Sequence, residues 1–392
     1  FITPQNGGAL RCFYLVQQLS KTLHLTLVTV HSAEEVGQVF PQAEVVSTNT
    51  YGHMHNKTGL LHKLWNACKH RWFRKKWNEP ANEFFLQWYS MLKKHIKQQN
   101  YDWVIFENLE MVNWYAGICR KYLPSAKLIY DAHNVDSVLW QNLYKANPSN
   151  NHLLQYAKNA EKIEKSLHQL VNACTCCSVV DANWLNKLNK QPLPIVVIPN
   201  GVAIADKPFD TQANKTAIKN LLFCGTLNYQ PNEEAIYWFC QKVLPLIQET
   251  NWQLWVVGKG ASPTLIHFLK QFPPIKLIGE VASVNTYYHQ TGIAIAPLQQ
   301  GSGTRLKILE AMSLGSPIVT TKLGAEGIDA IAGKHLLIAD SPKQFAEAIQ
   351  SLWHNTQKGE DLRREARLFV EKNYDWEVIG HKLRTYLHSF NQ

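Results

Sequence analysis

The feature that most constrains the fold is a twofold alternation of short apolar runs with helical segments along the 392 residues. Apolar runs bounded by polar residues, such as 102–106 in the first half and 253–257 in the second, predict strands of parallel sheets. Each half also carries glycine directly after its first predicted strand, at Gly7 and Gly8 and at Gly225. We therefore expect an α/β chain with two Rossmann-like domains whose parallel sheets face each other across a cleft.

A polar stretch separates the two halves. Residues 203–219 contain Pro208 and show little periodicity, so they predict a linker. We expect one domain over residues 1–203 and a second over residues 204–373, followed by a last helix within residues 374–392. At this length each domain can bury a substantial core.

The composition favours a globular protein with anionic partners. The formal charge of +10 suits nucleotide diphosphates, acidic lipid surfaces or nucleic acid. No run approaches the roughly 18 apolar residues that a membrane-spanning helix needs, and no secretory segment follows Phe1. The tight cysteine group at 174–177 lacks the spacing of a zinc site, which favours buried free thiols in a reducing cytosol. We expect a cytoplasmic protein that needs no metal.

The segment 301–317 carries the clearest candidate binding site. Gly301, Ser302 and Gly303 let backbone amides approach a ligand, and a helical period begins at Thr304. The helix N-terminus, together with the cations Arg305 and Lys307, suits a phosphate or diphosphate. Glu310, one turn further on, can accept hydrogen bonds from two ribose hydroxyls. An ordinary strand–helix–strand unit with a solvated basic face is the alternative interpretation.

Two further positions point to the same cleft. Gly7 and Gly8 lie between a predicted strand and a helix, where the backbone can come close to a ligand. His133 follows the predicted strand 127–130, and the carboxyl ends of parallel strands face the ligand crevice. It can donate a hydrogen bond to a sugar hydroxyl, although a single histidine is often structural. Glu107 also ends a strand and is a weaker candidate.

Residues 61–97 interleave tryptophan and phenylalanine with lysine, arginine and histidine. This pattern suits an anionic membrane surface or a lipid-linked acceptor, because cations meet the headgroups and aromatic rings lie at the interface. Stacking on single-stranded nucleic acid is the less favoured alternative. Two ordinary helices with inward aromatics and solvated charges would give the same pattern.

Several of these motifs resemble retaining glycosyltransferase family 4. The resemblance lies in the segment 297–321, in the Gly-Gly loop followed by Arg11, in Asp-Ala-His-Asn at 131–134 and in Pro-Asn-Gly-Val at 199–202. It implies a GT-B fold in which Glu310 holds the ribose of a nucleotide sugar and His133 lies beside the donor sugar. Many members carry a second glutamate eight positions before the first; this chain has Ser302 there, as does a sub-branch with a Gly-Ser-Gly-Thr-Arg-Leu-Lys variant.

The resemblance extends to further donor-side positions. In much of the family the loop after Gly225 carries an Arg and a Lys that hold the diphosphate; neither is present here, so Arg305 and Lys307 are the expected substitutes. It implies catalytic roles for His133, Arg305, Lys307 and Glu310. The expected donor-binding residues are Gly7, Gly8, Arg11, Gly225, Thr226, Asn228, Val281 on the base side, Ser302, Gly303, Thr304 and Leu306. The last helix is expected to cross back onto the N-terminal domain.

The implied reaction moves a sugar from a nucleotide-diphosphate sugar to a saccharide or lipid-linked saccharide acceptor, with retention and without a cofactor or metal. We expect a role in polysaccharide or cell-surface glycan synthesis, at the inner membrane face through residues 61–97, and no nucleic-acid partner. Two alternatives remain open. One is a sugar-nucleotide epimerase of the same architecture, and the other is a two-lobed binding protein without catalysis.

Overall fold

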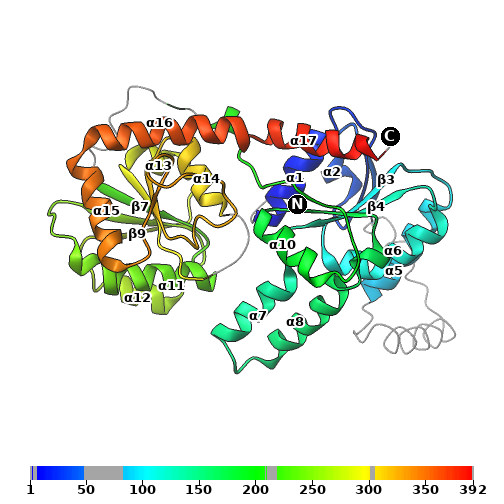
Figure 1. The fold of residues 1–392 in the computed structure, drawn as a ribbon, viewed down its shortest axis with the longest axis horizontal. Coiled ribbons are helices and arrows are strands. Elements are labelled where there is room, and N and C mark those ends of the chain that lie inside the picture. The colour runs from blue at the N-terminus through cyan, green and yellow to red at the C-terminus, as the bar shows by residue number, and fades with distance from the viewer. Residues whose placement is uncertain are drawn as a thin grey trace.

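The structure is a computed structural model that describes residues 2, 7–47, 83–207, 209, 219–300 and 305–390. These residues form two α/β lobes, each built around parallel strands with helices on their faces (Figure 1). The predicted class, an α/β chain with two Rossmann-like domains, is therefore confirmed.

The N-terminal lobe contains two groups of parallel strands. A four-stranded sheet has the order β3-β4-β5-β6, and β1 pairs with β2 beside it. Their bounds are β1 (Thr26–Thr29), β2 (Glu44–Ser47), β3 (Trp103–Phe106), β4 (Lys127–Ala132), β5 (Ala173–Cys176) and β6 (Ile195–Val197). The helices are α1 (Gly7–Leu19), α2 (Ala33–Val39), α5 (Glu83–Ile96), α6 (Leu109–Tyr122), α7 (Asp136–Ala146), α8 (Asn151–Glu164), α9 (Leu167–Leu170) and α10 (Val179–Leu188).

The C-terminal lobe has one six-stranded parallel sheet in the order β12-β11-β10-β7-β8-β9. Its strands are β7 (Asn220–Cys224), β8 (Gln253–Val257), β9 (Ile275–Gly279), β10 (Ile293–Ala296), β11 (Ile318–Thr320) and β12 (Leu337–Ile338). Its helices are α11 (Gln230–Trp238), α12 (Pro263–Leu269), α13 (Asn285–Gln290), α14 (Leu306–Ser313), α15 (Pro342–His354) and α16 (Thr356–Asn373). Because β7 lies between β8 and β10, the strand order reverses at the β7–β10 pair, where such sheets bind ligands.

Local sequence signals set the bounds of two elements. The apolar run 173–180 is a strand only to Cys176, because the Ser178 hydroxyl accepts a hydrogen bond from the Asp181 amide (3.1 Å) and begins α10. Helix α11 begins at Gln230, with Pro231 in its first turn, and the chain continues as a π turn from Phe239 and a 3₁₀ turn to Leu246. Most of the Trp-rich region, 61–82, lies outside the described residues.

The last helix, α17 (Trp376–Ser389), packs on α1 of the N-terminal lobe, as Figure 1 shows. Trp376 stacks on Tyr14 with ring centroids 5.2 Å apart, and the Arg384 guanidinium donates to the Gln18 carbonyl oxygen (2.8 Å). Since α16 belongs to the other lobe, α16 and α17 connect both lobes along one side of the molecule. Within the described part of the chain, no helix combines the length and apolar character needed to cross a membrane.

The α1–α17 contact depends on Gly380. A Cβ atom added there would lie 2.4 Å from Gln18 Cβ and 2.6 Å from Gln18 Cγ. We expect Gly380→Ala to lower the free energy of unfolding by about 1–3 kcal/mol, because the two helices must move apart. Urea unfolding followed by circular dichroism measures this.

Gly117 in α6 provides the matched control, because an added Cβ there meets no atom within 4 Å. Gly117→Ala should stabilise the protein by about 0.5–1 kcal/mol through helix propensity alone. Equal stability of Gly380→Ala and wild type would contradict the close contact.

Candidate functional site

The carboxyl ends of the N-terminal strands gather several polar side chains at one sheet edge. Glu107 follows β3, His133 follows β4 and Asn200 lies beyond β6. Cys12 reaches the same edge from α1, since its Sγ lies 3.1 Å from Glu107 Oε2. The topology of the parallel sheet therefore forms a polar surface from residues that are far apart in the sequence.

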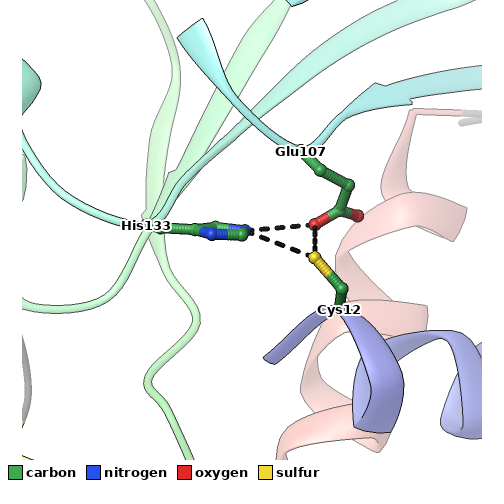
Figure 2. A group of neighbouring side chains, drawn as sticks. All are labelled: Cys12, Glu107 and His133. Atoms are coloured by element: carbon green, nitrogen blue, oxygen red, sulfur yellow. Dashed lines mark hydrogen bonds and ion pairs between the residues drawn. The ribbon is translucent and has the colours of Figure 1, made fainter. Parts of the chain in front are cut away.

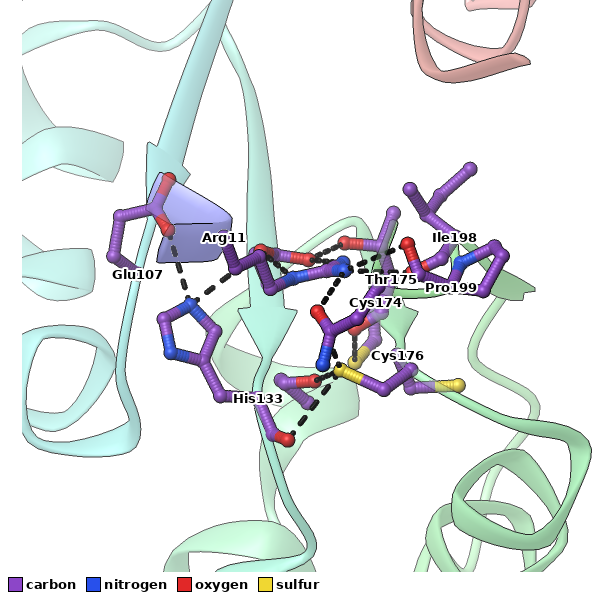
Figure 3. Close-up of polar contacts among 12 residues, drawn as sticks. Arg11, Glu107, His133, Cys174, Thr175, Cys176, Ile198 and Pro199 are labelled. Atoms are coloured by element: carbon purple, nitrogen blue, oxygen red, sulfur yellow. Dashed lines mark hydrogen bonds and ion pairs between the residues drawn. The ribbon is translucent and has the colours of Figure 1, made fainter. Parts of the chain in front are cut away.

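Buried hydrogen bonds of Arg11 hold this end of the sheet together (Figure 3). Its side chain is completely buried and bonds both Asp131 oxygens, Nε to Oδ2 at 2.7 Å and Nη2 to Oδ1 at 2.6 Å. Nη1 donates to the Ile198 carbonyl oxygen (2.8 Å) and to Asn200 Oδ1 (3.1 Å). Burial alone would raise the pKa of Asp131, but Arg11 and the His133 hydrogen bond hold it well below its usual range. The pair thus stays ionised inside the lobe.

This position changes the role of Arg11. We predicted it among the donor-binding residues, yet its guanidinium points into the N-terminal lobe and bonds protein atoms there. A direct contact with a donor in the cleft does not fit this geometry, because the charged head is enclosed. Arg11 instead fixes the ends of β4 and β6 relative to α1.

His133, Glu107 and Cys12 point toward one another at the carboxyl ends of β3 and β4 (Figure 2). His133 Nε2 lies 3.1 Å from Glu107 Oε2 and 3.9 Å from Cys12 Sγ. It also lies 3.6 Å from Asp131 Oδ2. Burial lowers the pKa of His133, but hydrogen bonds to Asp131, Cys12 and Glu107 outweigh it and raise the pKa well above its ordinary value. These hydrogen bonds therefore favour the protonated form of the His133 imidazole.

Across the cleft, Lys307 in the first turn of α14 is held by two contacts. Its ammonium donates to Asn232 Oδ1 (2.6 Å) and lies 4.5 Å above the Phe223 ring centroid. A Cβ at Gly225 would lie 2.8 Å from Lys307 Nζ, so a larger residue there would displace the ammonium from this position. Burial lowers the pKa of Lys307 to about 7; Arg305 contributes, while Cys224 and Glu310 oppose the shift.

The N-termini of α1 and α14 face each other. A Cβ on Gly7 would lie 3.5 Å from Leu306 Cδ1. A pocket at this junction is lined by residues of both lobes, among them Tyr14, Lys207, Leu306 and Glu310. Burial raises the pKa of Glu310, and Lys207 and Lys307 oppose that shift. Two positive helix ends with nearby lysines suit an anion, and Glu310 supplies an acceptor beside it.

The remaining predicted residues lie at several places around this junction. Gly8 is in the first turn of α1, and the Thr226 carbonyl accepts from Asn232 Nδ2 at 2.8 Å. The Asn228 side chain packs against Gly260, where a Cβ would lie 2.8 Å from Asn228 Cγ. Val281 packs on the apolar cluster that includes Ile308 and Leu309 of α14. Ser302, Gly303 and Thr304 lie outside the described residues.

Arg305 occupies the N-cap position of α14, and charged groups of both lobes influence its pKa. Burial lowers its pKa, whereas Tyr229, Glu326 and Asp181 raise it. Since Asp181 belongs to α10 of the N-terminal lobe, charges of both lobes act on this guanidinium.

Sequence reasoning missed three residues of the site. Cys12 looked like an ordinary helix position, Lys207 lay in the predicted linker, and Asn232 lay at the end of the loop predicted after Gly225. Only for Asn232 was a signal present, since it belongs to the glycine loop that borders the site. The other two contacts depend on how the lobes fold.

Two family models match the chain. Residues 6–206, more than half of the sequence, match the model described as Glycosyltransferase Family 4. Residues 218–355 match the model described as Glycosyl transferases group 1. The two matches divide the chain in the same way as the two lobes.

Relatives cover the chain to different extents. An uncharacterized 44.6 kDa protein in the cps region of Klebsiella pneumoniae is 24% identical, over 95% of this chain and 94% of that protein. Phosphatidyl-myo-inositol mannosyltransferase of Propionibacterium freudenreichii is also 24% identical, but over 47% of this chain and 48% of its own length.

Solved structures share the fold. HepE of Anabaena, crystallised in complex with UDP and glucose, superposes with a TM-score of 0.67 at 13% identity, over 98% of this chain and 96% of that one. Sucrose-phosphate synthase of Thermosynechococcus elongatus gives a TM-score of 0.70 at 14% identity, over 98% and 94%. At this identity the likeness establishes the GT-B fold.

Proposed function

Because the chain belongs to glycosyltransferase family 4, we propose that it transfers a sugar from a nucleotide-diphosphate sugar to an acceptor, with retention of the anomeric configuration. One observation carries the proposal: Lys307 and Glu310 on α14 lie where this helix meets the N-terminus of α1. Helix N-termini and lysine side chains suit a diphosphate, and the Glu310 carboxylate suits the hydroxyls of a ribose.

The donor is proposed to lie at the carboxyl ends of the central strands β7 and β10 of the C-terminal lobe. Lys307, Arg305 and the α14 amides stabilise the charge that develops on the departing diphosphate. Glu310 accepts hydrogen bonds from the ribose hydroxyls, and Val281 borders the base. The UDP complex of Anabaena HepE makes UDP the first nucleotide to test.

The sugar is proposed to lie beside His133. An imidazolium at this position can donate from Nε2 to a sugar hydroxyl as charge develops at the anomeric centre. The proposed retaining route uses no covalent sugar–protein intermediate, and the leaving phosphate accepts the proton of the attacking hydroxyl. Closure of the two lobes excludes water and so limits hydrolysis.

The acceptor is proposed to be a saccharide or lipid-linked saccharide at an anionic membrane surface. In the described part of residues 61–97, Trp88 is buried and stacks on Tyr115 at 6.2 Å, so this aromatic belongs to the core. Lys93 and Lys97 instead lie 5.9 and 5.0 Å from the Tyr122 ring, which Lys121 also approaches at 5.6 Å. The mannosyltransferase relative, whose name describes a phosphatidylinositol acceptor, supports a lipid class.

Glu310→Ala tests the nucleotide site. We expect UDP to bind the variant about 10–100-fold more weakly, because a charged group that accepts hydrogen bonds contributes about 1.5–3 kcal/mol. Isothermal titration calorimetry with UDP, GDP and ADP gives the affinities and identifies the base.

A comparison of two nucleotides on two protein variants separates loss of the ribose contact from a general loss of structure. Wild type should prefer UDP over 2′-deoxy-UDP, and Glu310→Ala should bind both equally. Glu347→Ala, at an exposed carboxylate of α15, should behave as wild type. Unchanged UDP affinity in Glu310→Ala would contradict the proposed contact of Glu310 with the ribose.

A separate assay distinguishes a transferase from an epimerase. A transferase should release UDP from a UDP-sugar only when an acceptor is added.

Lys307 predicts proton uptake on nucleotide binding. Its pKa is lowered to about 7 in the free protein, and a bound diphosphate must raise it. Between these two pKa values the complex holds a proton that the free protein lacks, so UDP affinity should fall by up to about ten-fold per pH unit above pH 7. Calorimetry at pH 8 in buffers of different ionisation enthalpy measures the uptake.

The nucleotide itself is almost fully ionised at pH 8, because the second phosphate pKa is about 6. Lys307→Met should therefore bind UDP without proton uptake and with a flat affinity profile from pH 7.5 to pH 9. The same uptake in wild type and Lys307→Met would assign the proton to another group.

The basic cluster Lys93, Lys97 and Lys121 predicts membrane binding. We expect the triple change to Glu to weaken binding to anionic phosphatidylglycerol vesicles in flotation by at least about 100-fold, since each lysine near such a surface contributes about 1 kcal/mol. The triple change of the exposed Lys343, Lys372 and Lys382 to Glu alters the net charge equally and should not affect flotation. Equal flotation of both variants and wild type would remove the membrane proposal.

A further inference from the structure

The Cys12, Glu107 and His133 side chains form a group of which the proposed transfer reaction uses only His133. Sγ, Oε2 and Nε2 all lie within 4.8 Å of one another and come from α1 and the ends of β3 and β4 (Figure 2). Side-chain exposure is 20% for His133 and 36% for Glu107, so a small ion can reach them from solvent. Sulfur, imidazole nitrogen and carboxylate oxygen are the ligand types of zinc.

The distances fit a tetrahedral ion. Zinc with one ligand of each type would hold S and N about 3.6 Å apart, S and O about 3.6 Å apart, and N and O about 3.4 Å apart. The observed separations are 3.9 Å for Sγ–Nε2, 3.1 Å for Sγ–Oε2 and 3.1 Å for Nε2–Oε2. Side-chain rotations that move each atom by a few tenths of an ångström therefore complete the three-ligand geometry.

The arrangement differs from a nucleophilic triad. In such a triad the histidine uses one ring nitrogen for the nucleophile and the other for the carboxylate. Here the thiol and the carboxylate both approach Nε2. Three groups that converge on one point suit a shared cation, whereas a proton relay needs them in line.

The surrounding charge also favours a cation. Asp131 Oδ2 lies 3.6 Å from His133 Nε2, and the neighbouring Arg11 guanidinium is bound to the Asp131 carboxylate. The cationic head of Arg11 is thereby directed to Asp131 and to the carbonyl oxygens of Ile198 and Pro199, as Figure 3 shows. Glu107 adds a second carboxylate on the open side.

We propose that Cys12, Glu107 and His133 bind a zinc ion at the cleft, with a fourth position open to water. Coordination releases the Cys12 thiol proton and the His133 Nε2 proton to solvent and leaves one zinc–thiolate and one zinc–imidazole bond. Magnesium and calcium should not compete, because they prefer oxygen ligands alone. The bound ion covers His133 Nε2, the atom proposed above to meet the donor sugar, so zinc inhibits transfer; this consequence, unlike the binding itself, rests on the proposed function.

Metal binding is measured directly on the full chain after its metal has been removed. Zinc is titrated in competition with a chromophoric chelator, and cobalt is used to observe thiolate-to-metal charge transfer. We expect Cys12→Ser to lose the charge-transfer band and at least ten-fold in zinc affinity. Glu107→Gln serves as a second variant should Cys12→Ser fold poorly.

Cys240 provides the matched control, because it is a free cysteine buried in the core of the C-terminal lobe. Cys240→Ala should keep the band and the affinity of wild type. Wild-type affinity in both Cys12→Ser and Glu107→Gln, or loss of the band in Cys240→Ala alone, would overturn the site.

Activity tests the consequence separately. Zinc should inhibit wild-type transfer, EDTA should restore it, and the zinc concentration for half inhibition should rise at least ten-fold in Glu107→Gln relative to its own zinc-free rate. Zinc binding without inhibition would refute the placement of the sugar at His133 and leave the metal site intact. Absence of transfer under all conditions would refute the proposed function alone.

Discussion

The rest of the molecule depends on the buried ion pair between Arg11 and Asp131. Neither side chain is more than 3% exposed, and both carboxylate oxygens accept from the guanidinium. Removing one partner of such a pair leaves an uncompensated charge in the interior, at a cost of about 3–5 kcal/mol. The pair ties α1 to the ends of β4 and β6, so it fixes both the N-terminus of α1 and the backbone that carries His133. This one interaction thus positions the parts of α1, β4 and β6 that surround His133.

A second constraint joins the two lobes where the chain passes between them. Val202 bridges to Asp375, with the Val202 amide donating to the Tyr374 carbonyl oxygen at 2.9 Å. Gly201 is confined there, since a Cβ would lie 2.7 Å from that same carbonyl oxygen and 2.6 Å from Ile379 Cδ1. The two chain crossings therefore lie side by side and are held together by backbone hydrogen bonds.

The sequence predicted what periodicity and local chemistry determine. Both parallel sheets, the strand that ends before His133 and the helix that carries Lys307 and Glu310 follow from apolar runs and glycine punctuation. The role of Arg11 was not predictable, because a motif gives the position of an arginine but not the direction of its side chain. Cys12, Glu107 and His133 are separated by up to 121 residues, and only the shared edge of the sheet brings them together. Sequence spacing therefore contains no metal signature, although the three ligand atoms converge.

Lys307 shows how the site prepares for an anion before one binds. Its pKa near 7 means that the fold holds the ammonium at a desolvation cost, which the Asn232 oxygen and the Phe223 ring offset only in part. The Lys307 ammonium is already held in place in the free protein. Gly225 leaves room for it, and Gly258, at φ +152°, allows the neighbouring turn to approach Gly225. In the proposed complex, a diphosphate between α1 and α14 supplies the missing counter-charge. Binding energy then comes from relief of an unfavourable charge as well as from new contacts, so the affinity for the anion and the strain in the free protein have the same origin.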